Sequence, residues 1–249
     1  MTLPSLDFDI YTEEGERGWI GSWFNNGPDN ITAIGEPVKV QLVDETNILV
    51  STSAPKGLTE AWTLKLQGKL RPRTADTLFE FGLTVAGRAK LYIDGNLVID
   101  NWTRQRRGES FFAVGSEQEK GTYQLKANTA HDILLEFVNV RGPADGDEDE
   151  TIMETSAGVR VGGAEVQDPE QSLQQAVKLA KEADVAILVV GLNGDWETEG
   201  YDRTTLALPG RTDELIDKVL AVNENTVIVT QAVSRSIKPE IRILLLILN

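Results

Sequence analysis

Between Trp19 and Asn139, short apolar segments alternate with polar positions at a period of two residues, with Gly, Asn and Asp at the breaks. This alternation is typical of antiparallel β-strands. The clearest hairpin is "LYIDGNLVI", in which Asp94-Gly95 separates two alternating stretches, and both residue types tolerate the positive φ of a tight turn. The pattern predicts an all-β sandwich, with a structural role for Asp94.

The pattern changes after "RGPADGDEDE", an acidic stretch at residues 141–150 that predicts a solvated linker. "DPEQSLQQAVKLAKEAD" then begins with Asp168 as an N-cap and Pro169 at the first helical position. An apolar strand at 185–192, a second amphipathic helix and a second apolar strand follow. This order predicts an α/β region with a parallel sheet whose two faces are both covered by helices.

The longest apolar run is "IRILLLIL", residues 241–248. It is far too short to span a bilayer, which takes roughly 20 residues. Two interpretations stay open: a buried strand whose partners lie beyond the end of the chain, or an exposed segment prone to aggregation. Either interpretation indicates a polypeptide that stops early.

Composition and charge limit the partners and the cell compartments expected for this chain. With 39 acidic and 24 basic residues the formal net charge is −15, which argues against a nucleic-acid or anionic-membrane surface. The absence of cysteine excludes disulfides and thiolate metal sites and suits a reducing compartment. Residues 1–10 lack the basic start and apolar core of a secretory signal, so we expect a cytoplasmic location. Two Asn-x-Thr sequons are short enough to occur by chance.

Candidate chemistry concentrates in "GDWETEGYDRTTLALPG", residues 194–210, which follows the strand at 185–192. Ligands of parallel sheets bind at the carboxyl ends of the strands. The segment contains no phosphate-binding glycine motif and no serine elbow. The single histidine, His131, lies in the β region, where a packing or surface role is expected, so a Ser-His triad and a histidine metal site are discarded.

What remains in this segment is a group of carboxylates, Asp195, Glu197, Glu199 and Asp202. Crowded acids beside Trp196 and Tyr201 could raise the pKa of one carboxyl group enough for general-acid catalysis, as glycoside hydrolysis requires. From residue types alone, a solvated acidic loop stays the competing interpretation.

The longer stretch "VAILVVGLNGDWETEGYDRTTLALPGRTDELI" resembles the C-terminal α/β-sandwich domain of glycoside hydrolase family 3, the β-glucosidases, in their fungal and yeast-like branch. "AGRAKLYIDGNLVIDNW" resembles the protective-antigen-type β-sandwich that such enzymes carry inserted in that domain. The resemblance covers about residues 1–234 and implies an antiparallel β-sandwich inserted into an incomplete α/β sandwich. The expected segments are 1–14 of the α/β domain, the β-sandwich at 15–142, a linker at 143–154 and the partial α/β domain at 155–249.

The resemblance implies that Glu199 is the acid/base residue, with Glu197 as the competing candidate. It further implies hydrolysis of terminal non-reducing β-D-glucosyl residues with retention, without cofactor or metal, and a homo-oligomer in full-length members. Asp202 and Arg203 are expected to fix the loop by a charge-assisted pair. Trp196 and Tyr201 are candidate substrate contacts.

The β region contributes a further candidate. In "ESFFAVG", residues 109–115, two adjacent phenylalanines cannot both face a core if the segment is extended, because neighbours in a strand alternate between faces. One of Phe111 and Phe112 is therefore a candidate sugar contact at the rim of an active site, and a loop that wraps both rings is the alternative. Trp19, Trp23, Trp62 and Trp102 are expected to pack in the core or on hairpins.

The family's nucleophile, an aspartate, belongs to an N-terminal barrel domain that has no counterpart in this sequence. An acid without a nucleophile cannot run the two-step mechanism. The sequence therefore predicts a β-glucosidase by descent whose isolated chain is inactive or nearly inactive. A carbohydrate-binding module without catalysis is the alternative function.

Overall fold

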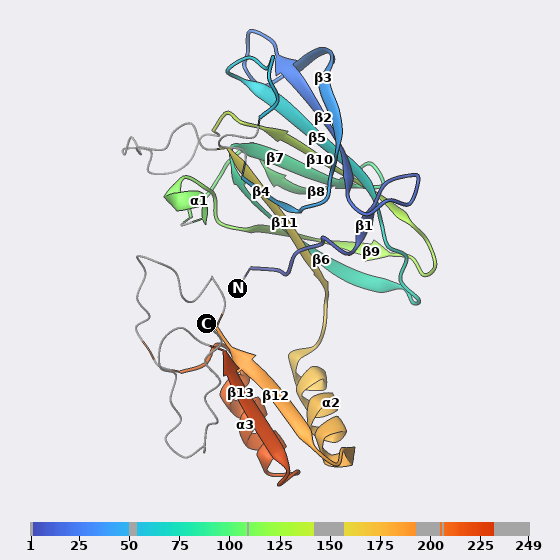
Figure 1. Cartoon of the computed structure of the whole chain (residues 1–249), viewed down its shortest axis with the longest axis vertical. Coiled ribbons are helices and arrows are strands. Elements are labelled where there is room, and N and C mark those ends of the chain that lie inside the picture. The colour runs from blue at the N-terminus through green and yellow to red at the C-terminus, as the bar shows by residue number, and fades with distance from the viewer. Residues whose placement is uncertain are drawn as a thin grey trace. The chain divides into compact units, whose positions relative to one another are not determined.

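The computed structural model describes residues 2–49, 54–108, 110–141, 157–192, 205 and 207–231, apart from the side chains of residues 112 and 113. The chain forms two compact units (Figure 1). The β unit comprises residues 2–166, and the α/β unit begins at Gln167. Expectations for residues outside these ranges, including the apolar run at 241–248, lie outside the described residues.

The β unit is built from two antiparallel sheets, as the alternation predicts. The larger sheet has the strand order β3 (Ala33–Val43), β2 (Trp19–Asn26), β5 (Trp62–Leu70), β10 (His131–Val138), β7 (Arg88–Ile93), β8 (Asn96–Asn101), and β1 (Ile10–Tyr11) pairs with β5. The smaller sheet has the order β4 (Asn47–Leu49), β11 (Gly158–Glu165), β6 (Thr77–Ala86), β9 (Glu119–Leu125).

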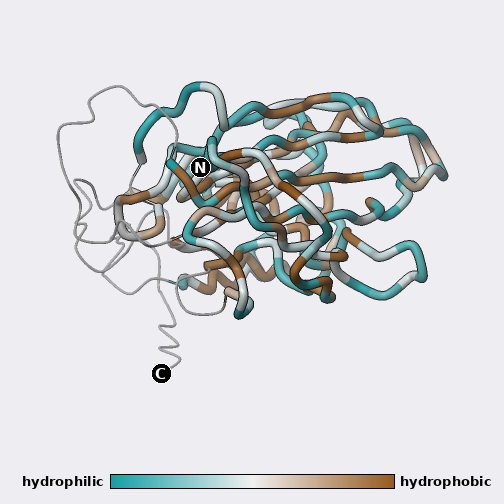
Figure 2. The backbone as a smooth tube through the Cα atoms, turned by 90° about the horizontal axis from the view of Figure 1, so that it is seen from above, coloured by the Kyte–Doolittle hydropathy of each residue, from teal (hydrophilic) through white to brown (hydrophobic). Residues whose placement is uncertain are grey.

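The core of the β unit lies between these sheets and follows the period of two. In β7, Ala89, Leu91 and Ile93 are buried, whereas the residues between them are half-exposed. Figure 2 shows hydrophobic and hydrophilic segments following one another along the backbone. Three of the four tryptophans considered, Trp19, Trp23 and Trp62, are buried in this core, as expected. The fourth, Trp102, is half-buried with Lys90 Nζ 5.6 Å from its ring centroid.

The predicted hairpin turn is confirmed. Asp94 and Gly95 join β7 to β8 with φ values of 49° and 77°. A positive φ at both central residues is the mark of the turn that suits a right-handed hairpin twist.

The division at Gln167 differs from the boundaries that the sequence suggested. Leu6 is fully buried in the core of the β unit, and Ile10 belongs to β1, so the described part of segment 1–14 lies with the β unit. Strand β11 lies in the smaller sheet, although its residues were assigned to the α/β domain. Val159 and Val161 alternate with Arg160 and face the core, which is the period-two signal that those boundaries overlooked.

The α/β unit contains helix α2 (Pro169–Glu182), strand β12 (Ala186–Gly191), helix α3 (Thr212–Leu220) and strand β13 (Thr226–Gln231). Strands β12 and β13 pair in parallel, as predicted. Asp168 caps α2, because its Oδ1 accepts the N–H groups of Glu170 at 2.8 Å and Gln171 at 3.3 Å. Among the described residues, no helix has both the length and the apolar character needed to cross a bilayer.

The expectation that helices cover both faces of this sheet is wrong for the described residues. Both helices pack on the face that carries Ala186, Leu188 and Val190 of β12. On the opposite face the residues Ile187 and Val189 are 66% and 68% exposed. An unbroken apolar run does not show how many helices meet each face, so the sequence could not distinguish the two arrangements.

Candidate functional site

The predicted catalytic residues lie outside the described residues. This applies to the four carboxylates of the loop, to its two aromatic residues and to Arg203: Asp195, Trp196, Glu197, Glu199, Tyr201, Asp202, Arg203. The side chain of Phe112 is likewise outside them. The structure therefore describes the strands and helices that precede and follow residues 193–204 in sequence.

The chain leaves strand β12 at the carboxyl edge of the parallel sheet. Gly191, the last residue of β12, pairs with Gln231, the last residue of β13, so both carboxyl ends lie at one edge. The N–H of Leu192 donates to the carbonyl oxygen of Gln231 at 2.9 Å. A Cβ at Gly191 would stand 1.9 Å from that same oxygen, so only glycine fits at the departure point.

The chain returns to the same sheet. Leu208 packs against a cluster of buried residues formed by Val190 of β12, Ile216 of α3 and Ile228 of β13. Gly210 adopts a φ of 60°, and Thr212 Oγ1 donates to the carbonyl oxygen of Pro209 at 2.7 Å. Both ends of the loop are thus fixed to the β12–β13 sheet.

A cluster of ion pairs around Arg211 fixes the chain where it enters helix α3. Arg211 Nη2 lies 2.7 Å from Glu170 Oε2 in the first turn of α2, and Arg211 Nε lies 2.7 Å from Glu214 Oε2 in α3. Lys218 Nζ lies 2.9 Å from Glu214 Oε1. Hydrogen bonds from Arg211, and secondarily from Lys218, lower the pKa of Glu214 to about 2. The cluster therefore stays charged at neutral pH and links the N-terminal ends of the two helices.

Sequence reasoning missed Arg211 and Leu208 as loop anchors. A signal for Arg211 was present, because Glu214 follows it by three residues, a spacing that brings side chains together on a helix. Its partner Glu170 is distant in sequence, so that contact had no local signal.

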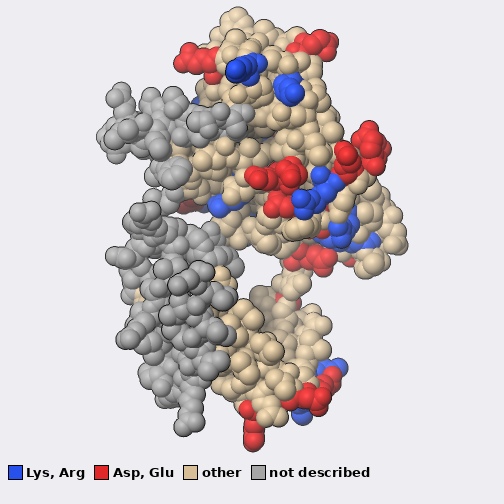
Figure 3. Space-filling model, viewed as in Figure 1, with Lys and Arg blue, Asp and Glu red and all other residues tan. Residues whose placement is uncertain are grey.

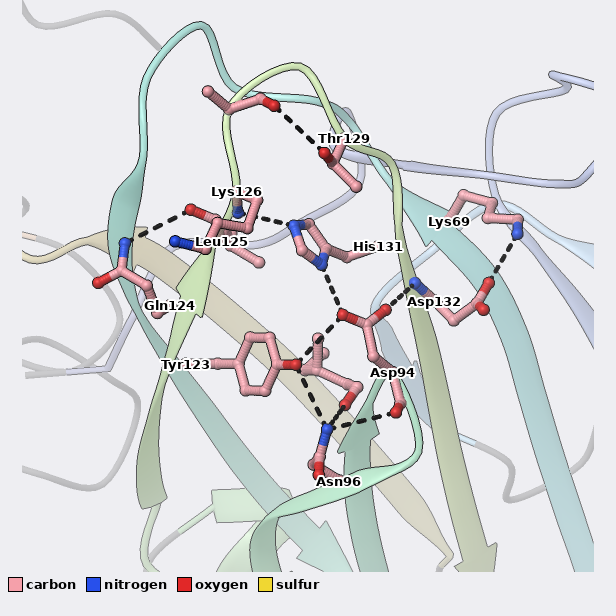
Figure 4. Close-up of polar contacts among 12 residues, drawn as sticks. Lys69, Asp94, Asn96, Tyr123, Gln124, Leu125, Lys126, Thr129, His131 and Asp132 are labelled. Carbon is pink, nitrogen blue, oxygen red and sulfur yellow. Dashed lines mark hydrogen bonds and ion pairs between the residues drawn. The ribbon is translucent and has the colours of Figure 1, made fainter.

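The β unit holds a second polar group, centred on Asp94 (Figure 4). Asp94 Oδ2 lies 2.6 Å from His131 Nδ1 and accepts the Tyr123 hydroxyl at 3.2 Å, and Asp94 Oδ1 accepts the N–H of Asp132 at 2.9 Å. His131 Nε2 accepts the N–H of Lys126 at 2.8 Å, so Nδ1 carries the proton that His131 donates to Asp94. Both ring nitrogens are occupied within the fold, which supports the packing role expected for His131.

The carboxylate of Asp94 is held in its charged form. Burial raises its pKa, but the hydrogen bonds from His131, from the backbone of Asp132 and from Tyr123 outweigh burial and hold the pKa below its usual value. Because these donors come from β10 and β9, Asp94 ties the β7–β8 turn to two further strands. The group is therefore a structural lock of the β unit.

Asp94→Asn is expected to reduce the free energy of unfolding by roughly 1–2 kcal/mol at pH 7, since the lost acceptor is charged but its side chain is 35% exposed. The folded-state pKa is lowered, so the stabilisation is present above the unfolded value of about 3.9 and is lost as pH falls through the folded-state value. Urea unfolding of both variants between neutral and acidic pH measures this difference. Asp132→Asn, at an exposed ion pair, is the control, and an equal loss in both variants would contradict the lock.

On the drawn face of the β unit, Lys and Arg are interspersed with Asp and Glu (Figure 3). Ion pairs of this unit include those of Lys69 Nζ, which lies 2.7 Å from Asp132 and 3.0 Å from Glu13. Among the described residues, no three His, Asp or Glu side chains gather as they would around a metal ion.

The segment of the two phenylalanine candidates is helical rather than extended. Residues Ser110–Ala113 form a short helix, α1, in which Phe111 has a φ of 53°. The half-buried ring of Phe111 covers Gly158 of β11, since a Cβ at Gly158 would stand 2.6 Å from its Cε1. The segment is thus not extended, so the alternation of faces expected for a strand does not apply to Phe111 and Phe112, and a helix of four residues is too short to show its own period.

Comparisons with known proteins agree on one relationship. A sequence profile of the glycosyl hydrolase family 3 C-terminal domain matches residues 27–241. "Probable beta-glucosidase J" of Aspergillus fumigatus is 38% identical over 229 residues, which are 92% of this chain and 26% of that protein. Its namesake in Emericella nidulans is 37% identical over 232 residues. This chain thus spans about a quarter of the length of the curated relatives it matches.

Among solved structures, the β-glucosidase from Kluyveromyces marxianus in complex with glucose is similar to this chain with a TM-score of 0.76 and 27% identity. The similarity covers 92% of this chain and 27% of that one. The combination of a β unit and an α/β unit is therefore shared with a glucose-binding protein of known structure.

Proposed function

The chain belongs to glycosyl hydrolase family 3, whose C-terminal domain it contains. We propose that it contributes the acid/base residue, Glu199, to a retaining β-glucosidase. The observation that supports the proposal is how the two ends of the segment that contains Glu199 are fixed. The chain leaves the carboxyl edge of β12–β13 at Gly191, before this segment in sequence, and packs on the same sheet again at Leu208, after it. The chain is also 38% identical to a protein named as a probable β-glucosidase.

In the proposed reaction, Glu199 first donates its proton to the glycosidic oxygen as the bond to the departing alcohol breaks. A nucleophilic carboxylate meanwhile attacks the anomeric carbon and forms a glycosyl-enzyme bond. Glu199, now a carboxylate, then removes a proton from the water that hydrolyses this bond. Two inversions at the anomeric carbon give net retention of the β configuration.

The other residues of the loop take supporting roles in the proposal. Trp196 and Tyr201 contact the terminal non-reducing β-D-glucosyl unit, and Asp202 with Arg203 fixes the shape of the loop by an ion pair. Glu197 is the competing acid. Phe111 or Phe112, in the β unit, contacts the sugar at the rim. A cytoplasmic location and a homo-oligomeric full-length protein stay predictions.

The nucleophile is expected to come from the barrel domain of the full-length protein, so the 249-residue chain by itself should release no nitrophenol from a nitrophenyl β-glucoside. The full-length polypeptide should hydrolyse this substrate and leave the α-anomer intact. Initial rates of both proteins on both anomers test the proposal. Hydrolysis by the isolated chain would show that it holds its own nucleophile.

Binding measurements on the same proteins distinguish the alternative function. If the full-length protein binds a β-glucoside but hydrolyses neither anomer, its function is carbohydrate binding without catalysis. The affinity should then be unchanged in Glu199→Gln.

A further inference from the structure

The first Asn-x-Thr sequon lies at the tip of the connection between β2 and β3. Asp29 holds this turn, because its Oδ1 accepts the N–H groups of Ile31 at 3.1 Å and Thr32 at 2.9 Å, and its Oδ2 accepts the Thr32 hydroxyl at 2.5 Å. Asn30 is exposed with a φ of 61°, and its backbone oxygen accepts a hydrogen bond from Asn26. Within the described part of the chain, no hydrogen bond involves the side-chain amide of Asn30.

The second sequon has a turn of the same construction at the end of β8. Asp100 Oδ1 accepts the N–H groups of Trp102 and Thr103, each at 2.9 Å, and Asp100 Oδ2 accepts the Thr103 hydroxyl at 2.7 Å. The two Asp-Asn-x-Thr sequences therefore fix their backbones by the same three hydrogen bonds. They form a matched pair that differs in the surroundings of the asparagine.

The surroundings of Asn101 are those of a core residue. Its side chain is fully buried. Its Nδ2 donates to the carbonyl oxygen of Leu83 at 3.0 Å and to Ser116 Oγ at 2.8 Å, and its Oδ1 accepts from Gln105 Nε2 at 3.1 Å. Both amide hydrogens are thus used inside the fold, and a substituent on this nitrogen would break at least one of these bonds.

The chemistry of N-linked glycosylation separates the two positions. The asparagine nitrogen forms a bond to the anomeric carbon of an oligosaccharide, the bond from that carbon to a lipid pyrophosphate breaks, and the nitrogen releases one proton. The product keeps one amide hydrogen and carries a large hydrated group. Such a group needs open solvent around the nitrogen, which the exposed turn of Pro28 to Asn30 offers and the core around Asn101 does not.

We propose that Asn30 is an acceptor site for an N-linked glycan and that Asn101 is not. The donor is a lipid-pyrophosphate-linked oligosaccharide, which meets a polypeptide only in the secretory pathway. The proposal therefore concerns the capacity of each asparagine to accept a glycan when the chain is carried there, and a protein that stays in the cytoplasm would carry none. Because glycan transfer to a nascent chain reads the sequon before folding, Asn101 can be modified only at the expense of folding. The folded population should therefore carry one glycan, on Asn30.

The experiment directs the whole chain through the yeast secretory pathway behind a cleavable leader and analyses the secreted protein. Treatment with N-glycosidase in heavy-oxygen water leaves a labelled aspartate at each position that carried a glycan, and peptide mass spectrometry locates it. We expect the label at residue 30 and none at residue 101. A secreted, cooperatively unfolding protein with the label at 101, or without it at 30, would overturn the proposal.

Thr32→Ala and Thr103→Ala are the matched variants. Each removes one sequon hydroxyl and the same turn hydrogen bond, and each leaves its asparagine in place. Thr32→Ala should abolish the glycan on the secreted protein, whereas Thr103→Ala should leave it intact. A glycan that survives Thr32→Ala, or disappears in Thr103→Ala, would contradict the assignment even if one variant is secreted less well.

Discussion

Glu199→Gln in the full-length protein is expected to lower kcat for an unactivated aryl β-glucoside by roughly 10²–10⁴-fold, the usual contribution of a positioned general acid/base. Glutamine keeps the size and hydrogen-bonding capacity of the side chain but holds no transferable proton. The departing phenol must then leave as its anion. Steady-state kinetics of the two proteins measure the loss.

The dependence on the leaving group separates loss of the acid from loss of folding. A dinitrophenolate is stable without protonation, so the first step on a dinitrophenyl β-glucoside should be largely retained in Glu199→Gln. The second step still needs a base, so the glycosyl-enzyme accumulates and KM falls together with kcat.

Glu197→Gln is the matched control, since it makes the same change two residues earlier in the loop. If Glu199 is the acid/base residue, Glu197→Gln should retain the dependence on leaving group of the unmodified protein. If instead Glu197→Gln shows the selective loss on poor leaving groups and Glu199→Gln does not, Glu197 is the acid/base residue and the assignment of Glu199 is wrong.

Phe81→Ala is expected to reduce the free energy of unfolding of the β unit by about 3–5 kcal/mol. Phe81 is fully buried in β6, and its ring centroid lies 4.8 Å from that of Phe79. Truncation removes the transfer free energy of the ring and leaves a cavity between the two sheets, which can close only by moving hydrogen-bonded strands. Equilibrium urea unfolding, followed by tryptophan fluorescence, measures the loss.

Phe8→Ala provides the comparison, because Phe8 is 68% exposed and the guanidinium of Arg17 lies over the face of its ring. A change within about 0.5 kcal/mol is expected, as for surface substitutions in general. Similar losses in Phe8→Ala and Phe81→Ala would contradict the placement of the core between the two sheets.

Local signals in the sequence were sufficient where one residue type decides the local structure. Asp94-Gly95 predicts its hairpin because few residues accept positive φ, and Asp168-Pro169 predicts the start of α2 because the cap and the fixed φ act within one turn. Features that depend on distant partners were not predictable in this way. The membership of β11 in the smaller sheet depends on its pairing with β6, and the one-sided cover of β12 depends on where α2 and α3 pack.

In the candidate site, too, local signals identified candidate residues, whereas roles that depend on distant partners could not be predicted. Glu199 stands among four carboxylates within eight residues, and which of them is protonated at working pH depends on desolvation and charge in the folded enzyme. Residue type left all four carboxylates as candidates, and the family resemblance favoured Glu199, with Glu197 as the competing candidate. The anchors at Gly191 and Leu208 became apparent only from the folded contacts, and so did the ion pair of Arg211 with Glu170, since each depends on a partner that is distant in sequence.

The most direct test of the acid/base assignment is to add azide to the full-length Glu199→Gln variant during turnover of a dinitrophenyl β-glucoside. Azide attacks the glycosyl-enzyme without losing a proton, so it does not need the missing base. The assignment predicts faster turnover and formation of β-glucosyl azide, with no such effect in Glu197→Gln. Unchanged turnover with glucose as the sole product in Glu199→Gln, or rescue in Glu197→Gln instead, would contradict it.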